Sequence, residues 1–151
     1  MKPSGGWKST SHFKAKLTTS DADFYFISAI AVQGNTIVAG DCGEGGNPGP
    51  GAAYVFVKPA TGWKSMTESA KLTASDGKPY DCFGHSVAVS HDTVVVGAPT
   101  SQEGAAYVFV KPPNGWTNMT ETAKLTAFDA LVSPGLGTSV AISGGHSRGG
   151  F

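Results

Sequence analysis

Short apolar runs recur along the chain, separated by stretches rich in glycine, proline and polar residues. Residues 86–90 alternate, with Val87 and Val89 on one face and small residues on the other, which predicts a β-strand. Residues 93–98 form a continuous β-branched run, as expected for a strand covered on both faces, and residues 105–111 are rich in aromatic and β-branched residues. Residues 116–126 are the most polar and are predicted to form the outer edge strand.

The residues between these runs favour tight turns. His91-Asp92 follows the first predicted strand as a two-residue hairpin turn, and Gly34-Asn35 and Gly144-Gly145 hold nearly the same place in other parts of the chain. The 21 glycines are concentrated between the apolar runs, which is typical of many short strands joined by turns. The best helix candidate, residues 66–72, is short and contains threonine and serine, so we assign it to a strand.

Three sequence blocks repeat, and together they define a unit of 53–57 residues. The letters GAAYVFVKP at residues 51–59 recur without change at residues 104–112. A second block, with the pattern Ala-Lys-Leu-Thr-x-x-Asp, appears three times, at residues 15–21, 70–76 and 123–129, and a tryptophan precedes each copy (Trp7, Trp63 and Trp116). A third block, which opens the unit, also appears three times, at residues 28–32, 85–89 and 138–142.

Four antiparallel strands in a unit of this length are typical of a propeller blade. We therefore predict an all-β fold, an incomplete β-propeller in one repeat domain over residues 1–151. A lone blade cannot bury both faces, and stacked neighbours can. Because a closed propeller needs at least four blades, we expect a fragment of a longer product or a module completed by self-association. The predicted parts are the last strand of a preceding blade (7–19), two blades (27–72 and 85–126) and the start of a further blade (136–151).

Phe83-Gly84, followed by Gly-Ala-Pro at residues 97–99, resembles the signature of FG-GAP repeats. These repeats build the propeller of integrin α-subunits and of many bacterial and algal surface proteins, and the recurring blocks look like the bacterial-style branch. The first copy departs from the pattern with Phe26-Ile27 and with residues 39–41, and the third has Leu136-Gly137 and stops before its Gly-Ala-Pro.

The resemblance implies a non-enzymatic module for binding or adhesion, with a protein or glycan ligand, located outside the cell or on its surface. A lectin-like sugar binder and the accessory propeller of a larger secreted enzyme are the alternatives. Integrin-type repeats often hold Ca²⁺ on an aspartate-rich loop between the first two strands. Residues 33–35, 90–92 and 143–145 are too short to supply six or more oxygen ligands, so we predict no metal and no cofactor.

In a four-stranded blade, the loop joining the second and third strands lies on the same face as the connection between blades. This face gathers acidic residues, and the resemblance implies that ligands bind there; the alternative is a merely solvated acidic rim. The candidates are Asp41, Glu44, Asp81 and Glu103, with Asp23 and Asp76 nearby. Cys42 and Cys82 belong to the same face. A disulfide between them would join adjacent blades in an oxidising compartment; two free thiols are the alternative.

Composition and isolated motifs exclude several other functions. Eleven basic and eleven acidic side chains cancel, which disfavours binding to nucleic acid, and no apolar stretch is long enough to span a membrane. The first residues lack the apolar core of a secretory signal. Residues 145–149 match G-x-S-x-G but lack the strand and helix of a nucleophile elbow, so we predict no catalytic residue.

Three other residue sets have a structural and a functional interpretation. His12, His85, His91 and His146 lack the spacing of a helical zinc site, so we expect them to be solvated or hydrogen-bonded. The three tryptophans recur at one repeat position, which favours packing over sugar stacking. Asn118-Met119-Thr120 is a glycosylation sequon that matters only in a secreted eukaryotic protein.

Overall fold

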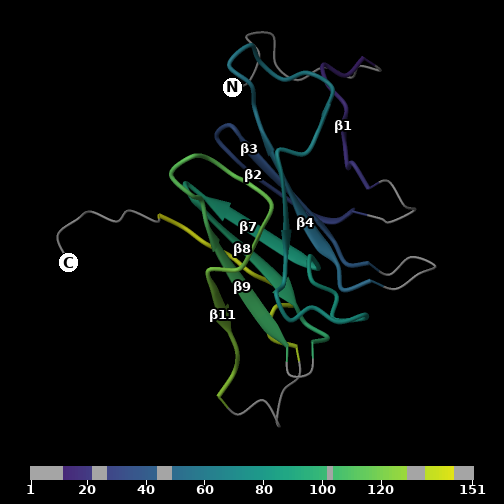
Figure 1. Ribbon diagram of the computed structural model, residues 1–151, viewed down its shortest axis with the longest axis vertical. Helices are drawn as coiled ribbons and strands as arrows, with labels where there is room; N and C mark the ends of the chain where they lie inside the picture. The colour runs from purple at the N-terminus through teal and green to yellow at the C-terminus, as the bar shows by residue number, and fades with distance from the viewer. Residues whose placement is uncertain (1–11, 22–26, 44–48, 102–103, 129–134, 145–151) are drawn as a thin grey trace, which may run out of the picture.

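The computed structural model describes residues 12–21, 27–43, 49–101, 104–128 and 135–144, and its described part is all-β (Figure 1). No described residue lies in a helix, so none of these segments supplies an apolar helix that would cross a bilayer. The strands are β1 (Leu17–Thr18), β2 (Ile27–Gln33), β3 (Thr36–Asp41), β4 (Ala52–Val57), β5 (Met66–Thr67), β6 (Ala70–Thr73), β7 (Ser86–Ser90), β8 (Thr93–Ala98), β9 (Ala105–Val110), β10 (Met119–Thr120) and β11 (Ala123–Leu125).

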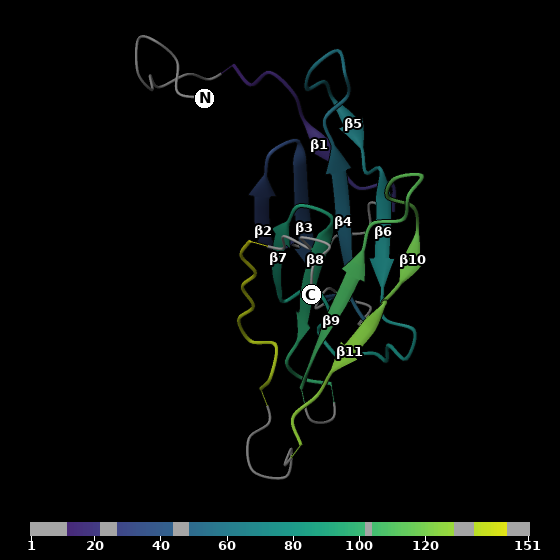
Figure 2. The ribbon, with the colours of Figure 1, turned by 90° about the vertical axis from the view of Figure 1, so that its left-hand side faces the viewer.

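Two antiparallel four-stranded sheets form the predicted blades. The first has the order β2-β3-β4-β6 and the second the order β7-β8-β9-β11, each running from an inner to an outer strand. Two of the three predicted two-residue hairpin turns are confirmed, because Gln33 pairs with Thr36 and Ser90 with Thr93. Gly145 of the third turn lies outside the described residues. The first residue of each turn has a positive φ, 55° at Gly34 and 51° at His91. The blades lie side by side (Figures 1 and 2).

The outer part of each unit differs from the prediction. Residues 116–126 do not form one strand, since β10 and β11 are separate and belong to different sheets. Strand β10 runs parallel to β6 of the preceding blade, where Met119 pairs with Leu72 (Figure 2). Residues 66–72, also predicted as one strand, are divided in the same way. Strand β5 pairs in parallel with β1 of the preceding unit, and only β6 joins its own blade. Each crossing covers the free edge of the preceding outer strand.

The core lies between the two blades. Its first half comes from Val38, Val55 and Leu72 of the first blade, and its second half from Phe83 and the strands β7 to β9. The Phe83 ring packs edge-on against Tyr107 at 5.3 Å and against Phe109 at 6.0 Å, measured between ring centroids. The predicted burial of apolar runs against a neighbouring copy is therefore present.

One face remains open at each end of this pair. Ile30 is 66% exposed, whereas Val87 at the same repeat position is 9% exposed because it packs on the first blade. At the other end Leu125 is 52% exposed, whereas its counterpart Leu72 is fully buried. Residues 138–142 match β2 and β7 in sequence but form no strand, and no described strand pairs with them. The described residues thus form two blades of an incomplete propeller.

Candidate functional site: the loop end of the blades

The repeat signature marks a close backbone contact between blades. A Cβ atom added to Gly40 would lie 2.0 Å from the carbonyl oxygen of Gly84, and one added to Gly97 would lie 1.9 Å from that of Gly137. Only glycine permits this approach. The Ser86 hydroxyl donates to the Gly137 carbonyl at 2.7 Å, as the Ser28 hydroxyl does to the Gly84 carbonyl at 3.0 Å. The glycines of both signature halves therefore align successive blades.

The loop end of the blades is formed by the loop between β3 and β4 and the connection between β6 and β7. The predicted acidic face is only partly present there. Asp41 is buried, and its carboxylate accepts a hydrogen bond of 2.9 Å from the Gly43 backbone N–H. Burial raises the pKa of Asp41. Asp81 is half-buried and accepts from the Lys78 N–H at 2.8 Å, so both described candidates stabilise their own loops. Glu44 and Glu103, with Asp23, lie outside the described residues.

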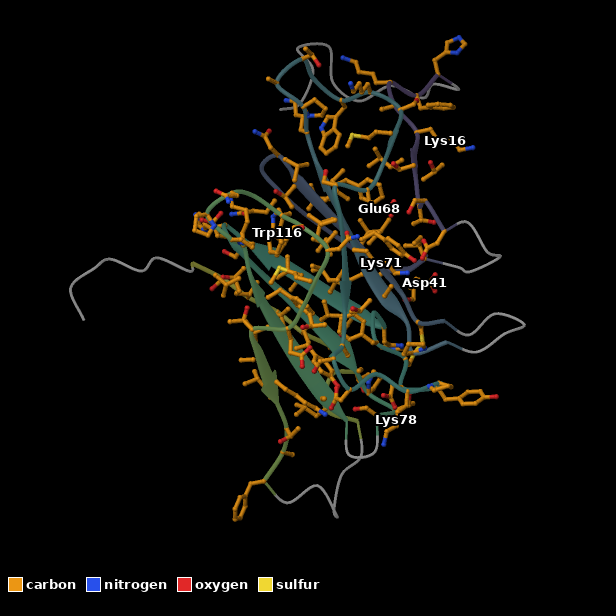
Figure 3. The ribbon with its side chains drawn as sticks, in the orientation of Figure 1. Lys16, Asp41, Glu68, Lys71, Lys78 and Trp116 are labelled. Atoms are coloured by element: carbon orange, nitrogen blue, oxygen red, sulfur yellow. A yellow bond between two sulfur atoms is a disulfide. The ribbon has the colours of Figure 1, made fainter. Side chains whose placement is uncertain are left out.

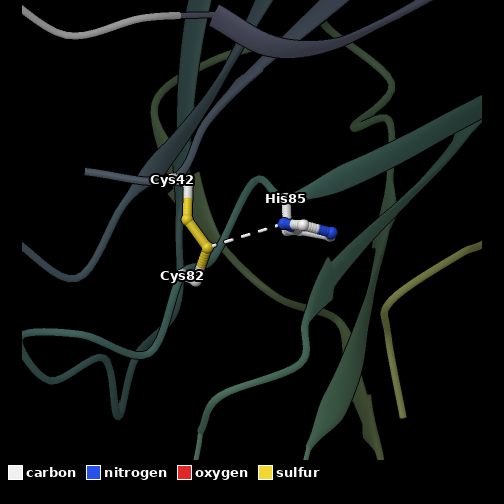
Figure 4. Close-up of side chains that lie close together, drawn as sticks. All are labelled: Cys42, Cys82 and His85. Atoms are coloured by element: carbon white, nitrogen blue, oxygen red, sulfur yellow. Dashed lines mark hydrogen bonds between the residues drawn. A yellow bond between two sulfur atoms is a disulfide. The ribbon is translucent and has the colours of Figure 1, made fainter. Parts of the chain in front are cut away.

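A disulfide joins Cys42 to Cys82, with Cα atoms 4.2 Å apart, inside the ~7 Å limit for such bonds (Figure 4). Cys42 follows β3 and Cys82 precedes β7, so the bond links adjacent blades. Both cysteines are buried. Nδ1 of His85 lies 3.7 Å from the Cys82 sulfur, and the three potential ligand atoms of these residues lie within 4.8 Å of one another. The sequence did not indicate this histidine, because the helical spacing sought there does not apply to a loop.

The sequence placed Asp76 only near the acidic face and did not predict the polar network that it forms with the next blade. The Asp76 carboxylate accepts from the Tyr107 hydroxyl at 3.0 Å and pairs with the Lys124 ammonium of the next blade. The hydrogen bond from Lys124, with a further contribution from Tyr107, lowers the pKa of Asp76. Burial and the bond to Asp76 raise the pKa of Tyr107 to about 12. We call these three residues the Asp76 network.

The same arrangement occurs one unit earlier, where Lys71 pairs with Asp21. The carboxylate of Glu68 accepts from the backbone N–H of Ser20 at 2.9 Å, and Lys71 and Glu68 lie on the same side of the blade (Figure 3). Glu121 accepts from the Ser75 N–H at the same distance. The recurring Ala-Lys-Leu-Thr block was the available signal, since its lysine and final aspartate are the two partners of each contact.

Next to the Asp76 network lies a small polar pocket of about 100 Å³. This volume is below the several hundred Å³ of typical small-molecule sites. Its described lining is Asp76, Lys78, Asp81, Ser101, Gly104, Lys124 and Thr126.

Two other candidates have structural roles in the described chain. Trp63 packs on the cluster around Tyr54 and Phe56, and Trp116 packs on the core between the blades, as the packing interpretation predicted. Asn118 of the sequon accepts from the Lys71 N–H at 2.8 Å and so joins neighbouring units. Trp7, His146 and residues 145–149 lie outside the described residues.

Antiparallel four-stranded sheets, packed on one another through aligned signature glycines, define a propeller-type repeat protein. A family model described as FG-GAP repeat matches residues 66–109, from β5 to near the end of β9. The chain therefore contains an FG-GAP repeat over residues 66–109, as the resemblance predicted. A search of curated proteins found no match.

Proposed function

We propose that the chain is a non-enzymatic binding module that takes a protein ligand on the loop end of its blades. The observation that carries this proposal is Tyr80, which is 73% exposed and lies in a loop with a positive φ of 71°. Such a backbone conformation is uncommon outside glycine and, where it persists, often belongs to a functional surface. Exposed tyrosines are frequent anchors of protein interfaces.

The Tyr80 loop is held in place from both sides. The Thr100 hydroxyl bonds the Tyr80 carbonyl, the Lys78 N–H bonds the Asp81 carboxylate, and the disulfide fixes Cys82 two residues further on. A loop whose backbone is already held in place loses little conformational freedom when a ligand binds. The small pocket that Lys78 and Asp81 of this loop help to line is suited to a single polar side chain of a partner rather than to a whole small molecule.

The test compares two exposed aromatic side chains. Tyr80→Ala removes the proposed anchor, and Phe13→Ala is the matched control, because Phe13 is also 73% exposed and lies outside the loop end. Wild-type and variant proteins would be applied to an array of extracellular protein domains and to a glycan array. We expect protein spots bound by wild type to be lost with Tyr80→Ala and kept with Phe13→Ala.

Glycan binding with the same dependence on Tyr80 would instead support the lectin-like alternative, since tyrosine also stacks on sugar rings. Absence of any binding, or binding unchanged by Tyr80→Ala, would refute the proposed site. The accessory role in a larger secreted enzyme would be decided by the sequence that flanks this region in its gene. A location outside the cell or on its surface is part of the proposal, and the disulfide supports it.

We further propose that the two open faces are covered by other blades, of a longer chain or of a second copy. The support is their complementarity, since they are the two kinds of face that meet in the core. Contact through two different faces is heterologous and produces rings or filaments. Sedimentation velocity over a range of concentrations tests this. A chain that stays monomeric and does not aggregate would contradict completion by self-association.

A further inference from the structure

The segment Cys82-Phe83-Gly84-His85 is a tight turn that brings a sulfur and an imidazole together. The His85 N–H donates to the Cys82 carbonyl at 3.1 Å, and both Cys82 and Gly84 have positive φ, 58° and 100°. As a result, Nδ1 of His85 faces the Cys82 sulfur at 3.7 Å, and Cys42 reaches the same point from the preceding blade (Figure 4).

The next junction along the chain forms the same turn without these residues. There the Thr138 N–H donates to the Gly135 carbonyl at 3.0 Å, and the Thr138 hydroxyl bonds that carbonyl at 2.7 Å. Gly135 stands at the position of Cys82, Thr138 at that of His85, and Pro99 at that of Cys42. The fold therefore requires neither cysteine nor histidine at this turn.

The disulfide accounts for two of these three side chains and leaves the histidine unexplained. His85 is exposed and adds nothing to the apolar core, yet its ring nitrogen lies at the sulfur pair. We propose that, once the disulfide is reduced, Cys42, Cys82 and His85 bind a Zn²⁺-type cation, with water as fourth ligand. This goes beyond the proposed binding function and replaces the expectation of no metal site.

The distances agree with tetrahedral coordination. Zn–S bonds of about 2.3 Å and Zn–N bonds of about 2.0–2.1 Å place a sulfur and a nitrogen ligand about 3.6 Å apart. The observed separation of 3.7 Å between the Cys82 sulfur and the His85 nitrogen is close to this value. Two thiolates and an imidazole favour zinc over calcium or magnesium, which prefer oxygen ligands. Exposed His85 gives the ion a route from solvent to the buried sulfurs.

The proposed sequence of steps is balanced with a dithiol as the reductant. The dithiol gives two electrons and two protons, the sulfur–sulfur bond breaks into two thiols, and the reductant closes into its own disulfide. Zn²⁺ then displaces both thiol protons into solvent and accepts the lone pair of His85 Nδ1. The junction between the blades is thus closed by a covalent bond when oxidised and by a metal ion when reduced.

Cobalt titration of the full chain tests the proposal. Oxidised protein, and protein reduced with dithiothreitol and then freed of it without air, would be titrated with Co²⁺ and then with Zn²⁺. Reduced wild type is expected to bind one Co²⁺ with thiolate-to-cobalt charge-transfer absorption that Zn²⁺ abolishes, and oxidised protein none. We expect His85→Ala to bind at least about tenfold more weakly, and His12→Ala, which leaves the cluster intact, to match wild type.

Thermal unfolding of the reduced protein gives a second readout. Zn²⁺ is expected to raise the Tm of reduced wild type in proportion to the logarithm of its concentration, with a smaller rise for His85→Ala. The proposal is wrong if reduced wild type shows no charge-transfer band, or if His85→Ala binds as tightly as wild type. It is also wrong if reduced protein is unfolded and Zn²⁺ does not restore its near-ultraviolet dichroism.

Discussion

Leu72 and Leu125 hold the same repeat position in the two blades, so truncating each of them measures how much the contact between blades stabilises the fold. Leu72 is fully buried in the core between the blades, whereas Leu125 at the equivalent position is 52% exposed. Leu72→Ala removes a buried side chain and leaves a cavity with little room to collapse, which costs about 2–5 kcal/mol. Leu125→Ala forfeits about half of a transfer energy of ~2 kcal/mol and encloses no cavity, so about 1 kcal/mol or less is expected.

Urea unfolding followed by tryptophan fluorescence, with the disulfide intact, is the suitable assay. With a slope of about 2 kcal/mol per molar urea, a loss of ~3 kcal/mol moves the midpoint by about 1.5 M. The slope itself should not change between the variants, because the surface exposed on unfolding is nearly the same. Both variants must be measured at concentrations where sedimentation shows a monomer.

Equal destabilisation by the two substitutions in a monomeric sample would refute the reasoning, since it would mean that neighbour packing does not set the burial of this position. A loss below about 1 kcal/mol for Leu72→Ala would have the same meaning. A cost for Leu125→Ala that rises with protein concentration would instead show that another copy covers the open face.

Three further predictions concern the contacts between blades. Gly40→Ala should lower stability by about 1–3 kcal/mol in urea unfolding, because its Cβ would meet a carbonyl oxygen at 2.0 Å; Gly49→Ala, with no neighbour within 4 Å, should change little, and equal effects would contradict the close approach. Folding lowers the pKa of Asp76 below its ordinary value of 3.8, so the ionised carboxylate stabilises the folded protein. This stabilisation is fully present above the ordinary pKa and is lost as the pH falls through the lower pKa of the folded state. Asp76→Asn should therefore be less stable than wild type at pH 7, by about 1 kcal/mol or less, and the two midpoints should converge in acid; a difference independent of pH would exclude the charge as its source. Reduction of the disulfide, which closes residues 40 apart in sequence, should cost up to about 4 kcal/mol in metal-free buffer, and an unchanged midpoint would show that the fold does not depend on it.

The strands and the stacking of blades could be predicted from the sequence because both leave periodic signals. Alternation at Val87 and Val89 and the turn at His91 are local, and the recurrence of whole blocks requires neighbours that bury equivalent faces. The approach of Cys42 to Cys82 followed from the blade topology alone. These features depend on the order of strands, which the repeat fixes.

Other features depend on contacts between units and leave no such signal. The parallel pairing of Met119 with Leu72 joins two short segments whose period does not reveal the partner. Asp41 was expected on a solvent-exposed face, but the backbone of the next blade at Gly84 packs beside it and leaves it buried. The role of His85 depends on a turn with positive φ, which sequence spacing does not encode.

The backward crossing of β5 and β10 means that a unit of sequence and a unit of structure are offset from one another. A blade excised at the borders of the sequence repeat would leave behind the two-residue strand that covers its rim, and would carry a strand that belongs to its neighbour. Because β10 lies between β9 and β11 in the chain, a cut beside it would separate β11 from its own blade. An array built from such units therefore needs the crossing segment of one further unit to cover its last blade.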